Sequence, residues 1–263
     1  AVASDVPAIL ENSTEDGQVG TAMPDSIDVT STETDYYIAT LEQFNSFQTQ
    51  SQSNTFAGCT VHLAANIELD GEFAGIGSLE VPFAGTFDGN GHTIDGLYYK
   101  GGQRVVGLFS YVGADNNGTY KTNIKNLNMT NAYIESTAAD GAGFVAGQAS
   151  KVAYFNGIYI DDTCEINSTV KGAGGILGQS GYNVFMSNIA MNGKVVGGSN
   201  VGAFAGTLSS GARLDIKSSY TSADLYAQGV TDRNLASTSA NVYVVKKQGT
   251  VDAIATQLNP EQM

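Results

Sequence analysis

The chain has 263 residues, of which 42% are hydrophobic and only 14% are charged, and this composition excludes a globally disordered protein. Its 32 glycines, 4 prolines and lack of tryptophan favour short strands joined by tight turns over a helical bundle. The net charge is −14, and no Lys or Arg precedes Lys100. Such an acidic surface repels phosphates and anionic lipids, which disfavours nucleic acid and membrane-surface partners. No stretch approaches the roughly 20 apolar residues of a membrane span, so we expect no membrane insertion.

Residues 1–35 are acidic and rich in Ser and Thr, which is typical of a mobile N-terminal leader or arm. The chain opens at Ala1 without an initiator Met, which fits a mature exported product as well as a trimmed chain. The apolar run Val6–Leu10 could dock as an added strand on a neighbouring molecule.

Residues 36–54 predict a capping helix. Ile38, Leu41, Phe44 and Phe47 recur at three-residue spacing with polar residues between them. This spacing indicates a short amphipathic helix that covers the first turn of the repeat region.

Residues 55–228 carry the strongest signal, which is internal repetition. The segments Val106–Phe109, Ala142–Val145, Ala173–Ile176 and Val201–Phe204 align on a shared glycine. In the last three segments a second glycine follows four residues after the first, at Gly147, Gly178 and Gly206; the first segment has Tyr111 there.

A second column of residues sets the register of the repeats. Gly and Asn are the residues that most readily adopt the left-handed backbone conformation, so a column of them predicts a bend repeated in every turn. Its members follow one another at intervals of 30, 31, 31 and 31 residues: Gly96, Asn126, Gly157, Asn188 and Ser219.

Each bend is followed by an apolar, a mixed and again an apolar residue, which is the period of a strand with one buried face. A further strand is expected around Ile134, Ile166, Val195 and Leu225. Three short strands per repeat predict a right-handed parallel β-helix of about five to six turns. A β-propeller blade needs about 40–50 residues, which is longer than the repeat in this sequence.

Residues 229–263 are expected to form a C-terminal strand at Val242–Val245 and a cap near Val251–Leu258. Truncation from a longer protein is an open option.

The stretch Pro82–Leu97 (PFAGTFDGNGHTIDGL), with Val106–Phe109 and Ile124–Leu127, resembles the GLUG-motif repeats of bacterial surface proteins. Thr60–Leu69 resembles the usual opening strand pair of that family. The resemblance covers about residues 36–228. It implies a β-helix of the kind found in adhesin-like proteins and in non-catalytic regions of large secreted peptidases, and it supplies no catalytic residues.

Residues suited to catalysis or metal binding are sparse. His62 lacks the partner His and Glu of a zinc-peptidase helix, and His92 follows Gly-Asn-Gly in a turn that fails the EF-hand pattern. Asp161 and Asp162 are the adjacent acidic pair that a polysaccharide-active β-helix enzyme would need to use, but neighbours in a strand point to opposite faces. We therefore expect no enzyme, no metal and no cofactor.

The two cysteines, Cys59 and Cys164, are expected about three turns apart, on the order of 14 Å. A disulfide needs Cα atoms within about 7 Å, so we expect two free, buried thiols.

For binding, the residue between the two apolar positions after each bend points outward. Tyr98, Asn128 and Tyr159 occupy this position, and rigid aromatics beside an amide suit a sugar or protein contact. We expect a secreted or cell-surface module for adhesion or surface display, whose partner is a glycan or protein of a host or neighbouring cell, or copies of itself. The alternatives are a subunit that assembles end to end into an extracellular filament, through strand edges and the N-terminal arm, and the polysaccharide-active enzyme.

Overall fold

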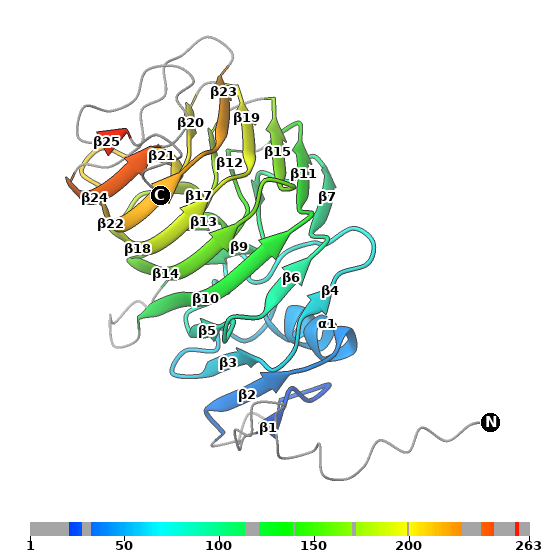
Figure 1. Ribbon diagram of the computed structural model, residues 1–263. Helices are drawn as coiled ribbons and strands as arrows, with labels where there is room; N and C mark the ends of the chain where they lie inside the picture. The colour runs from blue at the N-terminus through cyan, green and yellow to red at the C-terminus, as the bar shows by residue number, and fades with distance from the viewer. Residues whose placement is uncertain are drawn as a thin grey trace.

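The computed structural model describes residues 21–27, 33–113, 121–138, 140–169, 172–198, 200–227, 238–244 and 256–257, the last two stretches by their backbone alone. The chain winds repeatedly through four parallel sheets and forms a β-solenoid, with strands stacked turn upon turn (Figure 1). The predicted parallel β-helix is confirmed.

Sheet I runs the length of the solenoid and has twelve strands. Its members are β1 (Thr21–Ala22), β2 (Asp35–Ile38), β3 (Thr60–Leu63), β4 (Ile67–Glu68), β5 (Thr86–Asp88), β6 (Thr93–Asp95), β10 (Thr122–Thr130), β14 (Ala153–Ile160), β18 (Val184–Met191), β22 (Leu214–Thr221), β24 (Thr238–Val244) and β25 (Thr256–Gln257).

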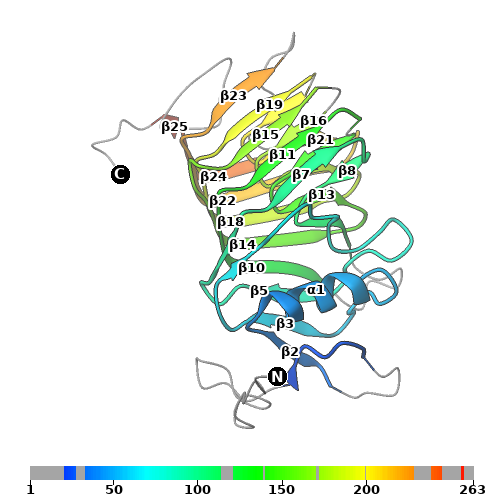
Figure 2. The same cartoon turned by 90° about the vertical axis from the view of Figure 1, so that its right-hand side faces the viewer.

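Three narrower sheets complete each turn (Figure 2). Sheet II contains β7 (Tyr98–Gly101), β11 (Tyr133–Ser136), β15 (Glu165–Ser168), β19 (Lys194–Gly197) and β23 (Asp224–Ala227). Sheet III contains β8 (Val105–Val106), β12 (Gly141–Gly143), β16 (Gly172–Gly174) and β20 (Asn200–Gly202). Sheet IV contains β9 (Phe109–Val112), β13 (Ala146–Ala149), β17 (Leu177–Ser180) and β21 (Ala205–Leu208). A turn therefore has four strand segments rather than the three expected. The extra segment arises because the glycine motif contributes to two short strands, one in sheet III and one in sheet IV.

The repeated glycines let sheets III and IV pack backbone against backbone. A Cβ on Gly147 of β13 would lie 2.7 Å from the backbone nitrogen of Val106, in the turn before it. Gly206 of β21 approaches Ala173 of β16 in the same way, at 2.8 Å. The predicted alignment of the four segments is confirmed, since Ala142 pairs with both Val106 and Ala173, and Ala173 pairs with Val201. The position of the second glycine in the first segment is held by Ser110, not Tyr111, because Tyr111 pairs with Gln148.

The long strands of sheet I bend where the Asn/Gly column predicts. Asn126, Gly157 and Asn188 have φ of 53°, 64° and 55°. In the next turn Ser218, with φ 49°, makes the bend instead of the predicted Ser219. The physical reason is a turn shorter by one residue, in which Ala190 pairs with Tyr220 and the buried Ser219 Oγ accepts a hydrogen bond from the Ile189 amide.

Gly96 does not belong to this column, which corrects the prediction. Asp95 pairs with Thr130, and the Gly96 amide donates to the Thr130 carbonyl, so Gly96 (φ 76°) lies beside Asn131 (φ 52°) at the corner between sheets I and II. The turn between β5 and β10 is longer than the others, with strand partners 35 to 37 residues apart, and equal spacing of repeats therefore fails there.

The helix α1 (Leu41–Gln50) closes the interior near the N-terminal end (Figure 2). Thr40 and Gln43 form a capping box at its start, and Phe44 and Phe47 are buried against aromatic rings of the first turns. The short N-terminal helix is confirmed, but Ile38 belongs to β2 and not to the helix.

Part of the predicted leader is built into the fold. β1 pairs with β2, Met23 is buried, and its amide donates to the Tyr37 carbonyl. Val6–Leu10 lies outside the described residues. At the other end, β24 contains most of the expected strand Val242–Val245, and β25 pairs with β24 inside the stretch expected to form a cap. Among the described residues, no helix has the length and apolarity to span a membrane.

Candidate functional site

Asn128 and Tyr159 are strand partners on the outer face of sheet I, as their shared position in the repeat predicts. Their column continues through neighbouring strands in strict register. We call it the tyrosine column, and its members are Thr93, Asn128, Tyr159, Ala190, Tyr220 and, by its backbone pairing, Tyr243.

Tyr98 does not belong to this column, which corrects the predicted trio. It lies in β7 of sheet II and pairs with Tyr133, 35 residues later, rather than with Asn128. The two tyrosine rings stack with centroids 6.0 Å apart and an angle of 17° between their planes. The long turn between β5 and β10 accounts for the displacement of both Gly96 and Tyr98 from their predicted positions.

The side chain of Asn128 is oriented by the turn below it. Its amide Nδ2 donates to the Gly91 carbonyl at 2.6 Å, and its backbone amide donates to the His92 carbonyl at 3.1 Å. Because the side-chain nitrogen is engaged within the fold, the Oδ1 atom is the part of this amide suited to accept a ligand hydroxyl. Tyr159 beside it is 39% exposed.

Aromatic side chains that are strand partners stack in other columns of the solenoid as well. Tyr154 and Phe185 have centroids 5.0 Å apart with planes 13° from parallel, and the Lys121 ammonium lies 5.6 Å from the centre of the Tyr154 ring. Lys151 sits over the exposed Tyr182 at 5.0 Å. Parts of the outer surface thus carry stacked aromatic side chains and tyrosines with a lysine over the ring.

A second candidate site is a recess at the corner near sheet III. In the turn before β7, the chain goes from Glu72, beside Tyr98, to Ile76, beside Phe109, in four residues. The next turn uses eleven residues between Tyr98 and Phe109. Because the chain before β7 has fewer residues at this corner than the next turn, it leaves a pocket of about 270 Å³ near the start of β8.

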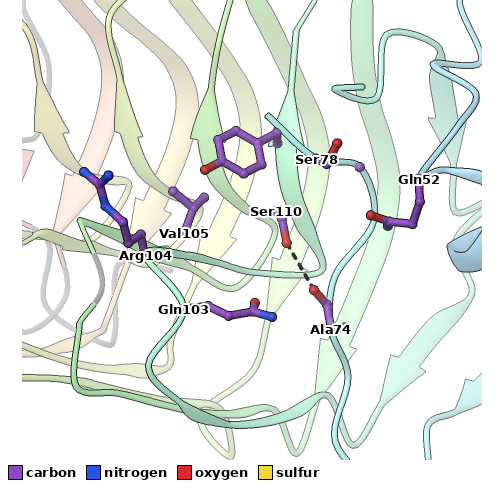
Figure 3. Close-up of a pocket in the computed structure, with 9 residues that line it drawn as sticks. Gln52, Ala74, Ser78, Gln103, Arg104, Val105 and Ser110 are labelled. Carbon is purple, nitrogen blue, oxygen red and sulfur yellow. Dashed lines mark hydrogen bonds between the residues drawn. The ribbon is translucent and has the colours of Figure 1, made fainter. Parts of the chain in front are cut away.

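Polar and apolar groups share the lining of this pocket (Figure 3). Ser110 Oγ donates to the Ala74 carbonyl across it, and Arg104 at the rim donates through Nε to Asp140 at 2.7 Å. Burial raises the pKa of the Tyr111 hydroxyl, so this group is a neutral donor near pH 7. The remaining lining residues are Gln52, Gly77, Ser78, Gln103 and Val105.

The acidic pair considered for catalysis lies in a turn. Asp161 Oδ1 accepts the backbone amide of Thr163 at 2.9 Å and orders the corner after β14, while Asp162 is exposed. His62 is stacked on Tyr37 with centroids 4.6 Å apart and contacts Asp35 at 3.1 Å. Within the part of the chain that the structure describes, no group of three His, Cys, Asp or Glu side chains could hold a metal ion.

Sequence reasoning missed Tyr220 in the tyrosine column, and the whole corner pocket. Placing Tyr220 in the column requires knowing that the repeat from Ala190 to Tyr220 is 30 residues long rather than 31. The pocket depends on a short cut in one turn, which no motif marks.

Comparison with known proteins supports the fold of this chain. A crystal structure from Bacteroides ovatus, described as a "putative immunoglobulin A1 protease", superimposes with a TM-score of 0.62 at 19% identity. The match covers 89% of this chain and 86% of that one. No protein-family model and no curated protein matches the sequence.

Proposed function

We propose that this chain is a non-enzymatic binding module of a secreted or surface-exposed protein, used for adhesion or surface display. One observation carries the proposal. Of the five exposed large hydrophobic side chains among the described residues, four are tyrosines: Tyr98, Tyr159, Tyr182 and Tyr226. Tyrosine combines a rigid apolar ring with a polar tip and is enriched in contact surfaces.

The scaffold suits this role. The interior is a continuous apolar core, so outward side chains are free to vary without loss of the fold. Parallel register repeats each outward position at about 4.8 Å along the axis, which produces long ladders rather than isolated groups. The resemblance to GLUG-motif surface proteins supports the same conclusion, and the net charge of −14 agrees with a glycan or protein partner on a host or neighbouring cell.

A direct test is the binding of fluorescently labelled protein to epithelial monolayers and to mucin-coated wells. The variant with Tyr98, Tyr159, Tyr182 and Tyr226 all changed to Ser is expected to lose most of the retained signal. Leu79→Ser is the matched control, because Leu79 is the fifth exposed large hydrophobic side chain. Equal retention of the fourfold variant and the wild type would contradict the proposal.

The alternative is end-to-end assembly. Within the described part of the chain, sheet I terminates in β1 and β25, whose outer edges another copy would have to pair with. Both edge strands have only two residues, and proteins use very short edge strands to limit edge pairing. Negative-stain microscopy separates the two functions, because a binding module gives particles of one length and a polymer gives filaments of variable length.

A further inference from the structure

The tyrosine column has a gap at Ala190. Ala190 pairs with Tyr159 on one side and with Tyr220 on the other, so a small side chain stands between two tyrosines. Neighbouring strands lie about 4.8 Å apart, which separates the two tyrosine positions by about 10 Å. The methyl group of Ala190 forms the floor of this gap.

Aromatic strand partners elsewhere in the solenoid show how the gap is oriented. Three such pairs stack face to face, with centroids 4.6, 6.0 and 5.0 Å apart and planes within 17° of parallel: Tyr37 with His62, Tyr98 with Tyr133, and Tyr154 with Phe185. The planes of aromatic rings on the outer face are thus roughly perpendicular to the solenoid axis, so that the rings stack along it. A ring placed above Ala190 would meet both tyrosines at about 5 Å, within the range of favourable aromatic contact.

The side chains along the floor are neutral amides. Asn188 and Asn192 flank Ala190 two residues away on β18 and just beyond its end, and Asn188 is exposed. Asn192 Oδ1 accepts the Ser222 hydroxyl at 2.8 Å. On the far side of Tyr159 in the column, Asn128 offers its Oδ1. Amides beside aromatic faces match the hydroxyls and the apolar C–H face of a sugar.

We infer that the gap between Tyr159 and Tyr220 is a binding slot for one pyranose ring of a neutral glycan. The ring would enter between the tyrosines, place its C–H faces on them, and turn its hydroxyls toward the amides at the rim. An aromatic side chain of a partner protein would fit the width of the slot but would bring no hydroxyl groups to the amides at its rim. This inference rests on the proposed binding function and names its ligand class.

The test uses saturation-transfer NMR with the methyl glycosides of glucose, galactose and N-acetylglucosamine as probes, and N-acetyltyrosinamide as the aromatic competitor. Because the protein has no tryptophan, tyrosine fluorescence gives a second readout. We expect the wild type to bind at least one glycoside with a Kd of about 1 mM. Tyr159→Ala and Tyr220→Ala should each weaken binding about five- to tenfold.

The decisive variant is Ala190→Tyr, which fills the slot without removing either wall. It should abolish glycoside binding while the protein stays folded, because the new ring completes a stacked ladder. Ala190→Ser keeps the slot and Tyr182→Ala removes an exposed tyrosine elsewhere, so both should bind as the wild type does.

Glycoside binding that survives Ala190→Tyr would overturn the slot. So would binding of N-acetyltyrosinamide alone, or of none of the probes. If the labelled protein still binds cells or mucin in those cases, the slot fails and the proposed function stands. If the glycosides bind but the cell and mucin assays are negative, the slot stands and adhesion fails.

Discussion

Gly147 lies against Val106 of the preceding turn so closely that a Cβ on Gly147 would stand 2.7 Å from the Val106 nitrogen and 2.9 Å from its carbonyl oxygen. Real Cβ atoms do not approach backbone atoms at these distances. The contact joins sheet IV of one turn to sheet III of the turn before it. It makes the second glycine of each repeat a packing residue.

Gly147→Ala should therefore destabilise the protein by about 1–3 kcal/mol or more, since the new Cβ would overlap the Val105 side chain and two backbone atoms of Val106 that cannot move aside. Gly181→Ala is the matched control. A Cβ there would meet only Ser209 Oγ, at 3.8 Å, and the expected change is within about 0.5 kcal/mol. Urea unfolding followed by circular dichroism measures both. Equal midpoints for the two variants would disprove the packing role.

At the bend of sheet I, Asn188 adopts φ 55°, a conformation that costs most residues about 1–2 kcal/mol. Asn188→Gly should keep or slightly raise the unfolding midpoint, whereas Asn188→Ala should lower stability by about 1 kcal/mol. Thermal unfolding of the pair distinguishes a conformational role from a side-chain one. If both substitutions lower the midpoint equally, the Asn side chain and not the backbone is what matters.

Asp88 is a buried carboxylate on β5. Burial raises its pKa, but hydrogen bonds from Lys125, the Asn90 amide and Asn126 outweigh this and leave the pKa lowered. Lys125 Nζ lies 2.7 Å from Asp88 Oδ2.

A carboxyl group with a lowered folded-state pKa contributes stability above its unfolded pKa of about 3.9, and it loses this stability as the pH falls through the folded-state pKa. The free energy of unfolding should therefore fall below about pH 4. Asp88→Asn should cost about 1–3 kcal/mol at pH 7 and make this decline shallower. Glu72→Gln, at an exposed carboxylate, should leave the pH curve unchanged. An identical acid decline in Asp88→Asn and wild type would exclude Asp88 as its source.

The two free cysteines should react at different rates. Burial raises the pKa of the Cys164 thiol to about 12, and its Sγ donates to the Met129 carbonyl at 3.5 Å. Cys59 is only half-buried, although burial raises its pKa as well. Since the thiolate is the reactive form, a thiol reagent at pH 8 should label Cys59 first and Cys164 only on unfolding. Fast labelling that persists in Cys59→Ser would contradict this.

Sequence periodicity predicted the turns from β10 to β21 well, because there the strand partners are 28 to 32 residues apart and the glycine motif marks each turn. It failed where the turn length changes. Simple counting aligns Tyr98 with Asn128, yet its partner is Tyr133, because the turn between β5 and β10 is longer. Ser218 replaced Ser219 for the opposite reason, a turn one residue shorter.

Only part of the candidate site could be predicted. Asn128 and Tyr159 follow from the repeat, since outward positions stay outward as long as the register holds. Ala190 has no functional group that would mark it as a site residue. It becomes a candidate only because it lies between Tyr159 and Tyr220 in the sheet. The corner pocket at Arg104 depends on how few residues join Glu72 to Ile76, and this is a three-dimensional property that composition does not express.

The backbone seam between sheets III and IV also bears on how such a chain can evolve. Each turn contacts mainly the turns beside it, so duplication of one whole turn would insert a new layer whose glycines meet those above and below. Lengthening by duplication needs no compensating change in the core, whereas a single base change in a glycine codon of the seam is costly. We therefore expect natural variants to differ in their number of turns more readily than in these glycines.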